Sequence, residues 1–159
     1  MKFTDGYWNM KKEITPLYAV EYADSRREGD DLVLYAPGKH ISHRGDCLNQ
    51  GMLTIRLSSP MEDVVKVSVI HFQGSAYSGP FAEIIKASPH VTIEESEEFL
   101  IYQSGSTRAV VDKRADSWGI RFLSGEQELT NTGFRNMAYM LNNQTGNKYT
   151  VDALAIDID

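Results

Sequence analysis

The chain has 159 residues, which is enough for one domain with a hydrophobic core but too few for a complete (β/α)8 barrel of about 250 residues. Hydrophobic residues make up 42% and charged residues 24%, values that argue against a disordered, collagen-like or coiled-coil chain. The formal net charge is -6 and no long basic run occurs, so nucleic acid is not an expected partner, whereas a neutral ligand such as a sugar is compatible.

Alternating hydrophobic and polar residues dominate the chain and predict strands with one face on a core and the other toward water. In chain order, the clearest runs cover residues 53–58, 65–69, 91–93 and 118–122. Such alternation is typical of antiparallel sheets, whereas buried parallel strands show continuous hydrophobic runs. Between residues 100 and 130 the pattern predicts a meander of strands and turns that leaves no room for a crossover helix.

Helical signals are weak. Residues 80–86 predict one or two helical turns, and residues 134–141 have some helical propensity but no clear cap. Gly105 and Gly125 instead indicate hairpin tips, because glycine readily adopts the positive φ that tight hairpins require. The residues thus predict an all-β antiparallel sandwich or barrel of about ten short strands, with at most one or two short helical turns.

The C-terminal segment alternates without a stop signal. Leu154, Ile156 and Ile158 alternate with smaller or acidic residues as far as Asp159, which predicts a strand still in progress. Domains usually end in a polar, frayed segment. The expectation is therefore a single domain over residues 1–159 that is incomplete at its C-terminal end.

Compartment signals are few. Cys47 is the single cysteine, so no intramolecular disulfide is expected, which fits a reducing compartment, and we interpret it as a loop or core thiol because no activating context surrounds it. No signal-peptide core and no stretch of about 20 apolar residues is visible. The prediction is a cytoplasmic protein without a membrane partner.

The titratable residues give no strong signal for catalysis or metal binding. His40 and His43 are three residues apart and would face opposite sides of a strand, so no metal site and no cofactor is predicted. The acidic run 94–98 is expected to be a solvated hairpin rather than the carboxylate pair of a glycosidase. His71 continues a strand face and is interpreted mainly as a hydrogen-bonded residue.

Aromatic side chains are the better candidates for a ligand contact, since a pyranose offers an apolar face to an aromatic ring. The carbohydrate-contact candidates are Trp8, His71, Tyr77 and Phe81. Trp118 is a further possible contact, but it shares the inward period of residues 118–122, which favours a place in the core.

One further motif, Arg44-Gly45-Asp46, matches a cell-adhesion tripeptide. Three residues often match by chance, and no secretion signal accompanies them. An adhesion or interaction domain therefore stays only a minor alternative.

The order of several segments resembles the N-terminal domain of family-31 glycoside hydrolases, in the bacterial α-xylosidase branch. The first eight residues are similar to the opening of that branch. The similar segments that follow in the expected order are residues 53–60, 64–67, 70–74, 79–80, 90–93 and 104–105. The segment 41–50, which contains Cys47, departs from the pattern and leaves the preference between xylosyl and glucosyl substrates open.

This resemblance implies a β-sandwich similar to galactose mutarotase that packs on a catalytic (β/α)8 barrel. In the family the barrel carries the two catalytic aspartates of a retaining mechanism, so the resemblance assigns no catalytic residue to this chain. It implies a non-catalytic domain that supports the pocket for an α-xylosyl or α-glucosyl oligosaccharide, with the barrel of the same polypeptide as partner and a homo-oligomer left open. A free-standing carbohydrate-binding module and a mutarotase-like protein with His71 as a base remain the alternatives.

Overall fold

The computed structural model describes residues 3–5, 9–70, 89–133 and 135–152. Within them fourteen strands form four antiparallel sheets. One short 3-10 helix, η1 (Arg44–Cys47), accompanies them. The predicted all-β antiparallel fold with at most one or two helical turns is therefore confirmed.

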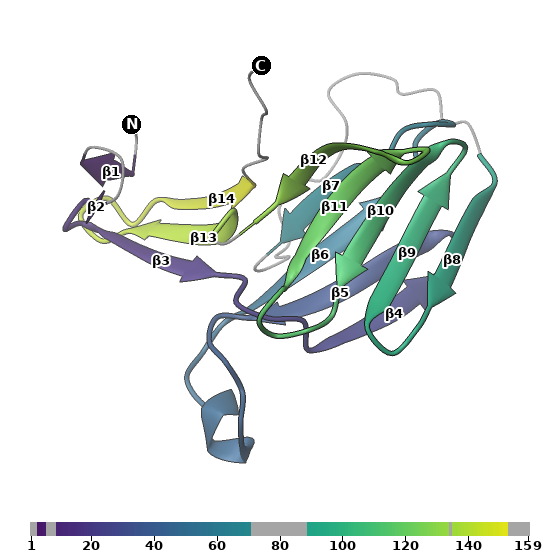
Figure 1. Ribbon diagram of the computed structural model, residues 1–159. Helices are drawn as coiled ribbons and strands as arrows, with labels where there is room; N and C mark the ends of the chain where they lie inside the picture. Colours follow the sequence, from purple (N-terminus) through teal and green to yellow (C-terminus); the bar gives the residue numbers. More distant parts are fainter. Residues whose placement is uncertain (1–2, 6–8, 71–88, 134, 153–159) are drawn as a thin grey trace.

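Two large sheets face each other and make the sandwich (Figure 1). The first contains β4 (Asp24–Glu28), β5 (Asp31–Pro37), β6 (Met52–Ser58) and β7 (Lys66–Ile70), hydrogen-bonded in this order. The second contains β8 (Val91–Glu95), β9 (Phe99–Ser104), β10 (Thr107–Asp112), β11 (Gly119–Ser124) and β12 (Gln127–Thr132), again with sequential neighbours paired. The second sheet is the meander that the sequence predicted between residues 100 and 130.

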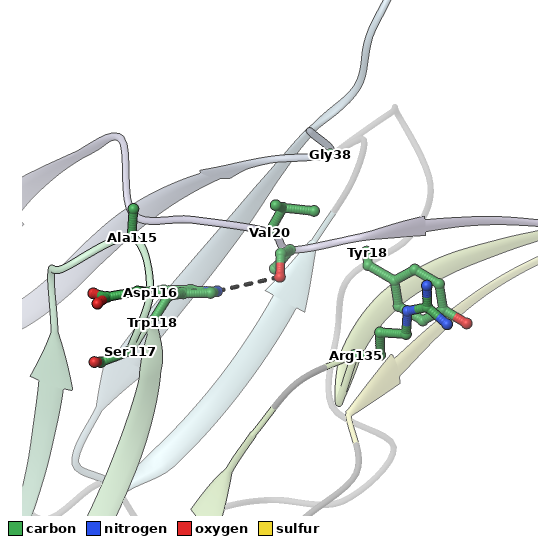
Figure 2. A pocket seen from close by; sticks show the side chains of 9 residues that line it. Tyr18, Val20, Gly38, Ala115, Asp116, Ser117, Trp118 and Arg135 are labelled. Carbon is green, nitrogen blue, oxygen red and sulfur yellow. Dashed lines mark hydrogen bonds between the residues drawn. The ribbon is translucent and has the colours of Figure 1, made fainter. Parts of the chain in front are cut away.

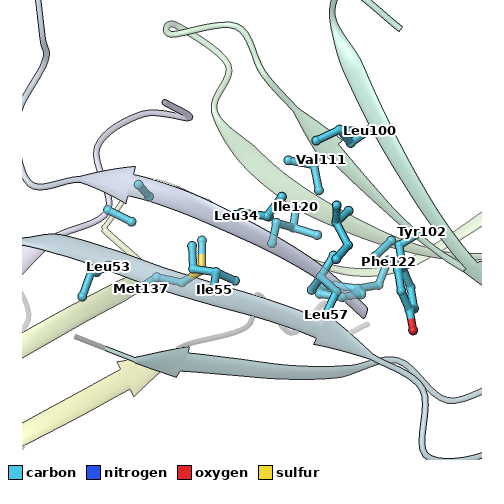
Figure 3. Packing of buried hydrophobic residues seen from close by; sticks show 14 of the residues in the cluster. Leu34, Leu53, Ile55, Leu57, Leu100, Tyr102, Val111, Ile120, Phe122 and Met137 are labelled. Atoms are coloured by element: carbon cyan, nitrogen blue, oxygen red, sulfur yellow. The ribbon is translucent and has the colours of Figure 1, made fainter. Parts of the chain in front are cut away.

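The core between these sheets follows from the period-two pattern, because alternate residues of facing strands point inward. Figure 3 shows side chains of both sheets meeting in this layer. Fully buried members include Leu34, Ile55, Leu57, Leu100, Val111 and Ile120. Tyr102 is also fully buried among them, and burial raises the pKa of its hydroxyl to about 12.

Polar contacts close one end of the sandwich. The loop between β6 and β7 meets the tip of the β9–β10 hairpin, where the Asp63 carboxylate accepts hydrogen bonds from the backbone N–H of Ser106 at 2.6 Å and from its hydroxyl at 2.8 Å. The Ser59 hydroxyl donates to the Ser104 hydroxyl at 2.8 Å. Since these bonds join the two sheets, they fix how the sheets are placed relative to each other at this end.

A smaller sheet extends from the sandwich, and its strands come from the segments before and after the sandwich strands in the sequence (Figure 1). It contains β14 (Lys148–Asp152), β13 (Met137–Asn142) and β3 (Ile14–Tyr18), in that order, beside the short pair β1 (Thr4–Asp5) and β2 (Asn9–Met10). A separate hydrophobic cluster packs around Ile14, Ala138 and Met140. The chain thus has a main core and a satellite core.

The helical propensity suggested for residues 134–141 is wrong for the described residues. Residues 137–142 form β13, the central strand of the small sheet, in which Ala138 pairs with Tyr18 on one side and with Val151 on the other. Pairing on both edges outweighs a weak local helical preference. The helical turns predicted at residues 80–86 lie outside the described residues, as does the continuation of the last strand beyond Asp152.

Candidate functional site

The carbohydrate-contact residues predicted from the sequence lie outside the described residues. This holds for Trp8, His71, Tyr77 and Phe81. The candidate site described below is therefore built from other side chains.

A cavity of about 450 Å³ opens where the small sheet leaves the sandwich, and we name it the junction cavity. Its walls come from residues 18–20 and 115–118, together with two single residues, Gly38 just after β5 and Arg135. The lining residues are Tyr18, Ala19, Val20, Gly38, Ala115, Asp116, Ser117, Trp118 and Arg135 (Figure 2).

Trp118 forms one wall of the junction cavity. Its indole N–H donates to the backbone carbonyl of Ala19 at 3.2 Å, which fixes the ring and ties the β10–β11 loop to the segment after β3. The side chain packs against the main core but is only partly buried. The core position predicted for Trp118 is thus correct for part of its surface, and the remainder faces the cavity.

Tyr18 and Arg135 form the other wall, and Figure 2 shows them across the cavity from Trp118. The Arg135 guanidinium lies 5.3 Å from the centroid of the Tyr18 ring, a cation–π arrangement. Arg135 also has a φ of 63°, in the left-handed region that is uncommon for residues other than glycine. The fold therefore holds this cation in a specific place beside an aromatic ring.

The loop between β10 and β11 contributes Asp116 and Ser117, both exposed, to the lining of the junction cavity, and Figure 2 shows their side-chain oxygens on the side of the loop away from Tyr18 and Arg135. Its start is braced by Asp112, whose carboxylate accepts from Arg114 Nη2 at 2.6 Å, Nε at 2.9 Å and the backbone N–H at 3.1 Å. These bonds, led by the guanidinium, lower the pKa of Asp112 and raise that of Arg114.

The described lining residues of the junction cavity include one carboxylate. Glycoside hydrolysis needs two carboxyl groups about 5–10 Å apart. Among the described lining residues Asp116 is the one carboxylate, and its neighbours are a hydroxyl, a guanidinium and two aromatic rings. Such a set can position a ligand through stacking and hydrogen bonds.

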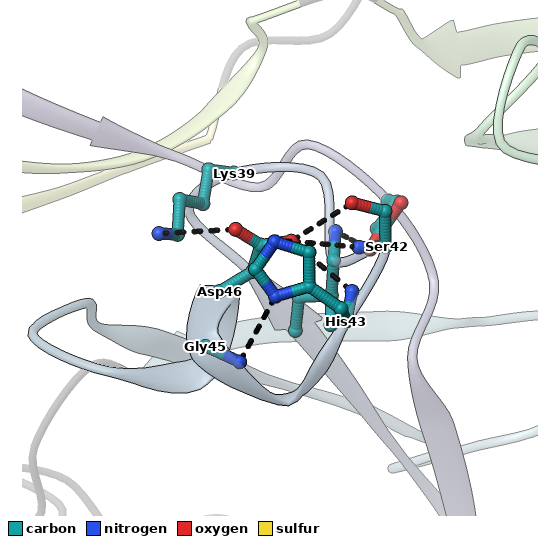
Figure 4. Close-up of polar contacts among 7 residues, drawn as sticks. Lys39, Ser42, His43, Gly45 and Asp46 are labelled. Atoms are coloured by element: carbon teal, nitrogen blue, oxygen red, sulfur yellow. Dashed lines mark hydrogen bonds and ion pairs between the residues drawn. The ribbon is translucent and has the colours of Figure 1, made fainter.

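An arm, residues 39–50, projects away from the sandwich (Figure 1). Buried Glu21 anchors its base by bonding the His40 ring and accepting from the Ile41 backbone N–H at 2.8 Å. At its tip His43 and Asp46 cap η1 reciprocally (Figure 4). The two histidines therefore have different partners, and no three His, Cys, Asp or Glu side chains gather as a metal site in the part of the chain that the structure describes.

The adhesion tripeptide lies in this arm, and its carboxylate is already engaged. Asp46 accepts from the Ser42 hydroxyl at 2.9 Å and from the backbone N–H groups of Ser42 and His43 at 3.1 Å each. These bonds, with the Ser42 hydroxyl first, lower the pKa of Asp46. An aspartate turned back on its own loop does not support an adhesion function. Cys47 is exposed beside it.

A second cavity, of about 420 Å³, lies beside the β6–β7 loop and the edge of β12. Its wall is mainly apolar, with Val64, Val65, Val67 and Leu129 among the lining residues. Asp152, at the end of β14, also lines it, and although the residue is exposed, partial loss of water around the carboxyl raises its pKa. We name this surface the β7–β12 patch.

Two of the curated relatives that match the chain are α-xylosidases. The chain is 33% identical over 159 residues to the alpha-xylosidase XylQ of Lactiplantibacillus pentosus, covering 100% of this chain and 21% of that protein. It is 27% identical over 163 residues to an alpha-xylosidase of Emericella nidulans, covering 97% of this chain and 20% of that protein. Along its whole length the chain is thus similar to about a fifth of each of these two α-xylosidases.

These matches confirm the resemblance to family-31 α-xylosidases that the segment order indicated. The chain spans about a fifth of the length of the relatives it matches. No protein-family model matches the chain. None of the described residues belongs to a helix long and apolar enough to cross a membrane.

Sequence reasoning missed most of the junction cavity. Asp116, Ser117 and Arg135 belong to no motif, and Tyr18 ends a strand without any distinguishing neighbour. Trp118 was a possible sugar contact, but its period-two position favoured the core. The one usable signal was the position of Trp118 at the start of a predicted strand, where a large ring can be half-buried.

Proposed function

We propose that the chain is a non-catalytic N-terminal β-sandwich domain of a retaining α-glycosidase, either an α-xylosidase or an α-glucosidase. The observation that carries this proposal is the match of the whole chain to about a fifth of each of two α-xylosidases. The sandwich fold supports it, because a sandwich of this size can be one unit of a longer polypeptide.

In this proposal the domain is galactose-mutarotase-like, packs on a catalytic (β/α)8 barrel of the same polypeptide and supports the pocket for an α-xylosyl or α-glucosyl substrate. The β7–β12 patch is the surface we assign to the barrel. Leu129 is 52% exposed and Val64 38%, and both apolar side chains line one concave surface. Clustered apolar exposure of this kind marks an interaction surface.

The test compares the 159-residue chain with the polypeptide encoded by the open reading frame that contains it. We expect the frame to continue into a barrel and the long product to hydrolyse an aryl α-xyloside or α-glucoside, with no turnover by the short chain. Turnover by the short chain that one of its own acidic residues controls would refute the proposal, as would a frame that stops at codon 159. Asp116→Asn and Glu126→Gln, which each change one exposed acidic residue, would test whether any turnover by the short chain depends on its own acids.

The proposal includes a cytoplasmic location and, where the polypeptide assembles, a homo-oligomer. A single cysteine that is exposed in the structure fits a reducing compartment. Light scattering on the long product would give the oligomeric state directly.

The second candidate is a free-standing carbohydrate-binding or mutarotase-like protein, and the junction cavity with its two aromatic walls favours it. Mutarotation needs a general base and a general acid around the sugar. Polarimetry would separate the two versions, because only a mutarotase accelerates anomer interconversion and loses that activity in His71→Ala. Binding without acceleration would indicate a binding module.

A further inference from the structure

We propose that the arm, residues 39–50, joins two copies of the chain into a symmetric dimer. Leu48 of one copy enters the junction cavity of the other, and Arg44 faces the acidic turn, residues 94–98, of that other copy. The contact is reciprocal, since each copy has an arm, a cavity and a turn. This inference names the surface behind the homo-oligomer of the proposed function and rests on that part of it alone.

Leu48 is the most exposed large apolar side chain among the described residues, at 68%. It directly follows η1 in the arm, which projects away from the sandwich (Figure 1). A single exposed leucine on the body of a protein is common and needs no explanation. On a projecting arm, however, the side chain has no neighbouring core of its own, so a partner molecule is what can bury it.

Hydrogen bonds hold the arm at its base and at its tip before any partner binds. At the base, buried Glu21 bonds the His40 ring and accepts from the backbone N–H of Ile41 at 2.8 Å. At the tip, His43 and Asp46 cap η1 reciprocally (Figure 4). Because the arm is already formed, little conformational entropy is lost when it docks.

The junction cavity, of about 450 Å³, suits an apolar side chain. Small or apolar side chains line much of it beside the partly buried ring of Trp118, namely Ala19, Val20 and Ala115. The Trp118 indole N–H already donates to the Ala19 carbonyl at 3.2 Å, so an apolar occupant leaves that donor satisfied. Asp116 and Ser117 are exposed, with their oxygens on the far side of the loop from the opposite wall (Figure 2). They can therefore keep their contact with water.

The charges of the arm and of the acidic turn are complementary. The turn contains four glutamates, all exposed. Two of them pair with Lys113 and Arg114, whereas Glu94 and Glu97 have no ion-pair partner among the described residues. The exposed side chain of Arg44 likewise has no ion-pair or hydrogen-bond partner in the part of the chain that the structure describes. Opposite charges that stay unpaired within one copy can pair between two copies.

The cavity and the acidic turn are close enough for one arm to meet both. The backbone N–H of Lys113 donates to the Glu98 carbonyl at 2.8 Å, and residues 115–118 of the same β10–β11 loop line the cavity. Gly38, directly before the arm, also lines the cavity. The arm therefore starts beside the cavity and leads away from it. Two arms set antiparallel about a two-fold axis bring each tip to the base of the other arm, where the cavity lies.

Sedimentation velocity on the 159-residue chain tests the dimer. A reductant is added, because Cys47 is exposed beside Leu48 and a disulfide would mimic association. We expect a reversible dimer of about 36 kDa, twice the chain mass of 17.9 kDa, with a dissociation constant on the order of 10 µM. Raising the salt to about 0.5 M should weaken it several-fold, since the charged contact lies at the solvent-exposed rim.

Three variants locate the contact. Leu48→Asp should weaken the dimer at least about tenfold, since it places a charge in an apolar cavity. Arg44→Glu and Glu97→Arg should each weaken it about tenfold, because each sets like charges against one another. The two charge reversals combined should restore the dimer, because the pair is then exchanged rather than broken. A purely structural role of either residue would not give this recovery.

Leu129→Asp and Glu126→Arg are the matched controls. Leu129 is 52% exposed in the β7–β12 patch, and Glu126 is exposed at the β11–β12 turn. Neither residue lines the junction cavity, so both variants should leave the dimer unchanged. The unfolding midpoints of all variants should stay close to that of the unmodified chain, since every changed side chain is exposed.

Three results would overturn the inference. One is a chain that stays monomeric up to about 200 µM, well above the expected dissociation constant. Another is a dimer that Leu129→Asp breaks and Leu48→Asp leaves intact, which would move the interface to the β7–β12 patch. The third is a charge-exchanged variant that associates no better than the single reversals. None of these results affects the hydrolysis test, and a reading frame that stops at codon 159 would refute the proposed domain without affecting the dimer, so the two proposals fail separately.

Discussion

Individual carboxylates in this chain act as organisers of loops. Asp46 caps the arm, Asp63 joins the two sheets and Asp112 braces the loop that carries the cavity rim. Each accepts several hydrogen bonds in its ionised form, which lowers the pKa of each carboxyl. A depressed pKa in the folded state means that folding favours the ionised form, so stability depends on pH.

Asp112→Asn tests this dependence at one residue. The folded-state pKa of Asp112 lies below its ordinary value of 3.8, chiefly because of the Arg114 guanidinium. The stabilising contribution is therefore present above pH 3.8 and is lost as pH falls through the lower folded-state pKa. We expect the variant to cost about 1 kcal/mol at neutral pH, because Arg114 is partly exposed. The measurement is urea unfolding at neutral pH and at a pH below the folded-state pKa.

The control for this prediction is Asp116→Asn, since Asp116 is exposed in the same loop. Its unfolding midpoint should match that of the unmodified chain at both pH values. A cost for Asp112→Asn that is equally large in acid would show that packing, rather than charge, carries the effect.

The residues of the candidate site were largely beyond reach from sequence. Aromatic type alone directed attention to Trp8, Tyr77 and Phe81, whereas Trp118 was assigned mainly to the core. A period-two pattern tells which face a residue occupies but not where the sheet ends, and Trp118 stands at that end, immediately before β11. Arg135 acquires its place only from tertiary contacts and an unusual φ.

At the scale of elements, strands and hairpins were predictable because their signals are local. Alternation within β6 and β11 matches their buried and exposed positions. The β13 strand was missed because its strand character comes from two partners that are distant in the sequence. The short helix η1 was missed because its reciprocal cap uses His43, an uncommon capping residue.

Two hairpin tips offer a matched test of how the sheets are joined. Gly105 and Gly125 have φ values of 57° and 58°, so alanine is strained equally at both. A Cβ on Gly125 meets nothing within 4 Å, whereas one on Gly105 would lie 2.3 Å from Asp63 Oδ1. Gly125→Ala should cost about 1 kcal/mol, and Gly105→Ala should cost more because it also disrupts the bonds from Ser106 to Asp63. Denaturant midpoints of the two variants give the comparison.

The pair is informative because backbone strain cancels between the two sites. Equal losses would mean that the Asp63 contact contributes nothing to stability. A combined Gly105→Ala and Asp63→Ala variant should recover part of the excess loss in Gly105→Ala, since the clash is then removed.

At the scale of the whole molecule, the residues that the structure describes form two hydrophobic clusters of different size. The larger lies between the sandwich sheets, and the smaller gathers around Ile14, Ala138 and Met140 in the small sheet. Trp118 and the junction cavity lie between the two parts, with the Trp118–Ala19 bond as a direct link. Regions with less buried apolar surface open at lower free energy than a main core.

Hydrogen exchange should therefore separate the two parts. Amides of β5, β6, β9 and β10 should exchange slowest, and those of β3, β13 and β14 faster, because the smaller cluster opens without the sandwich. Met140→Ala should speed exchange in the small sheet alone, whereas Ile55→Ala, a loss of about 2–5 kcal/mol in the main core, should speed it everywhere. Equal acceleration by both variants would show one cooperative unit.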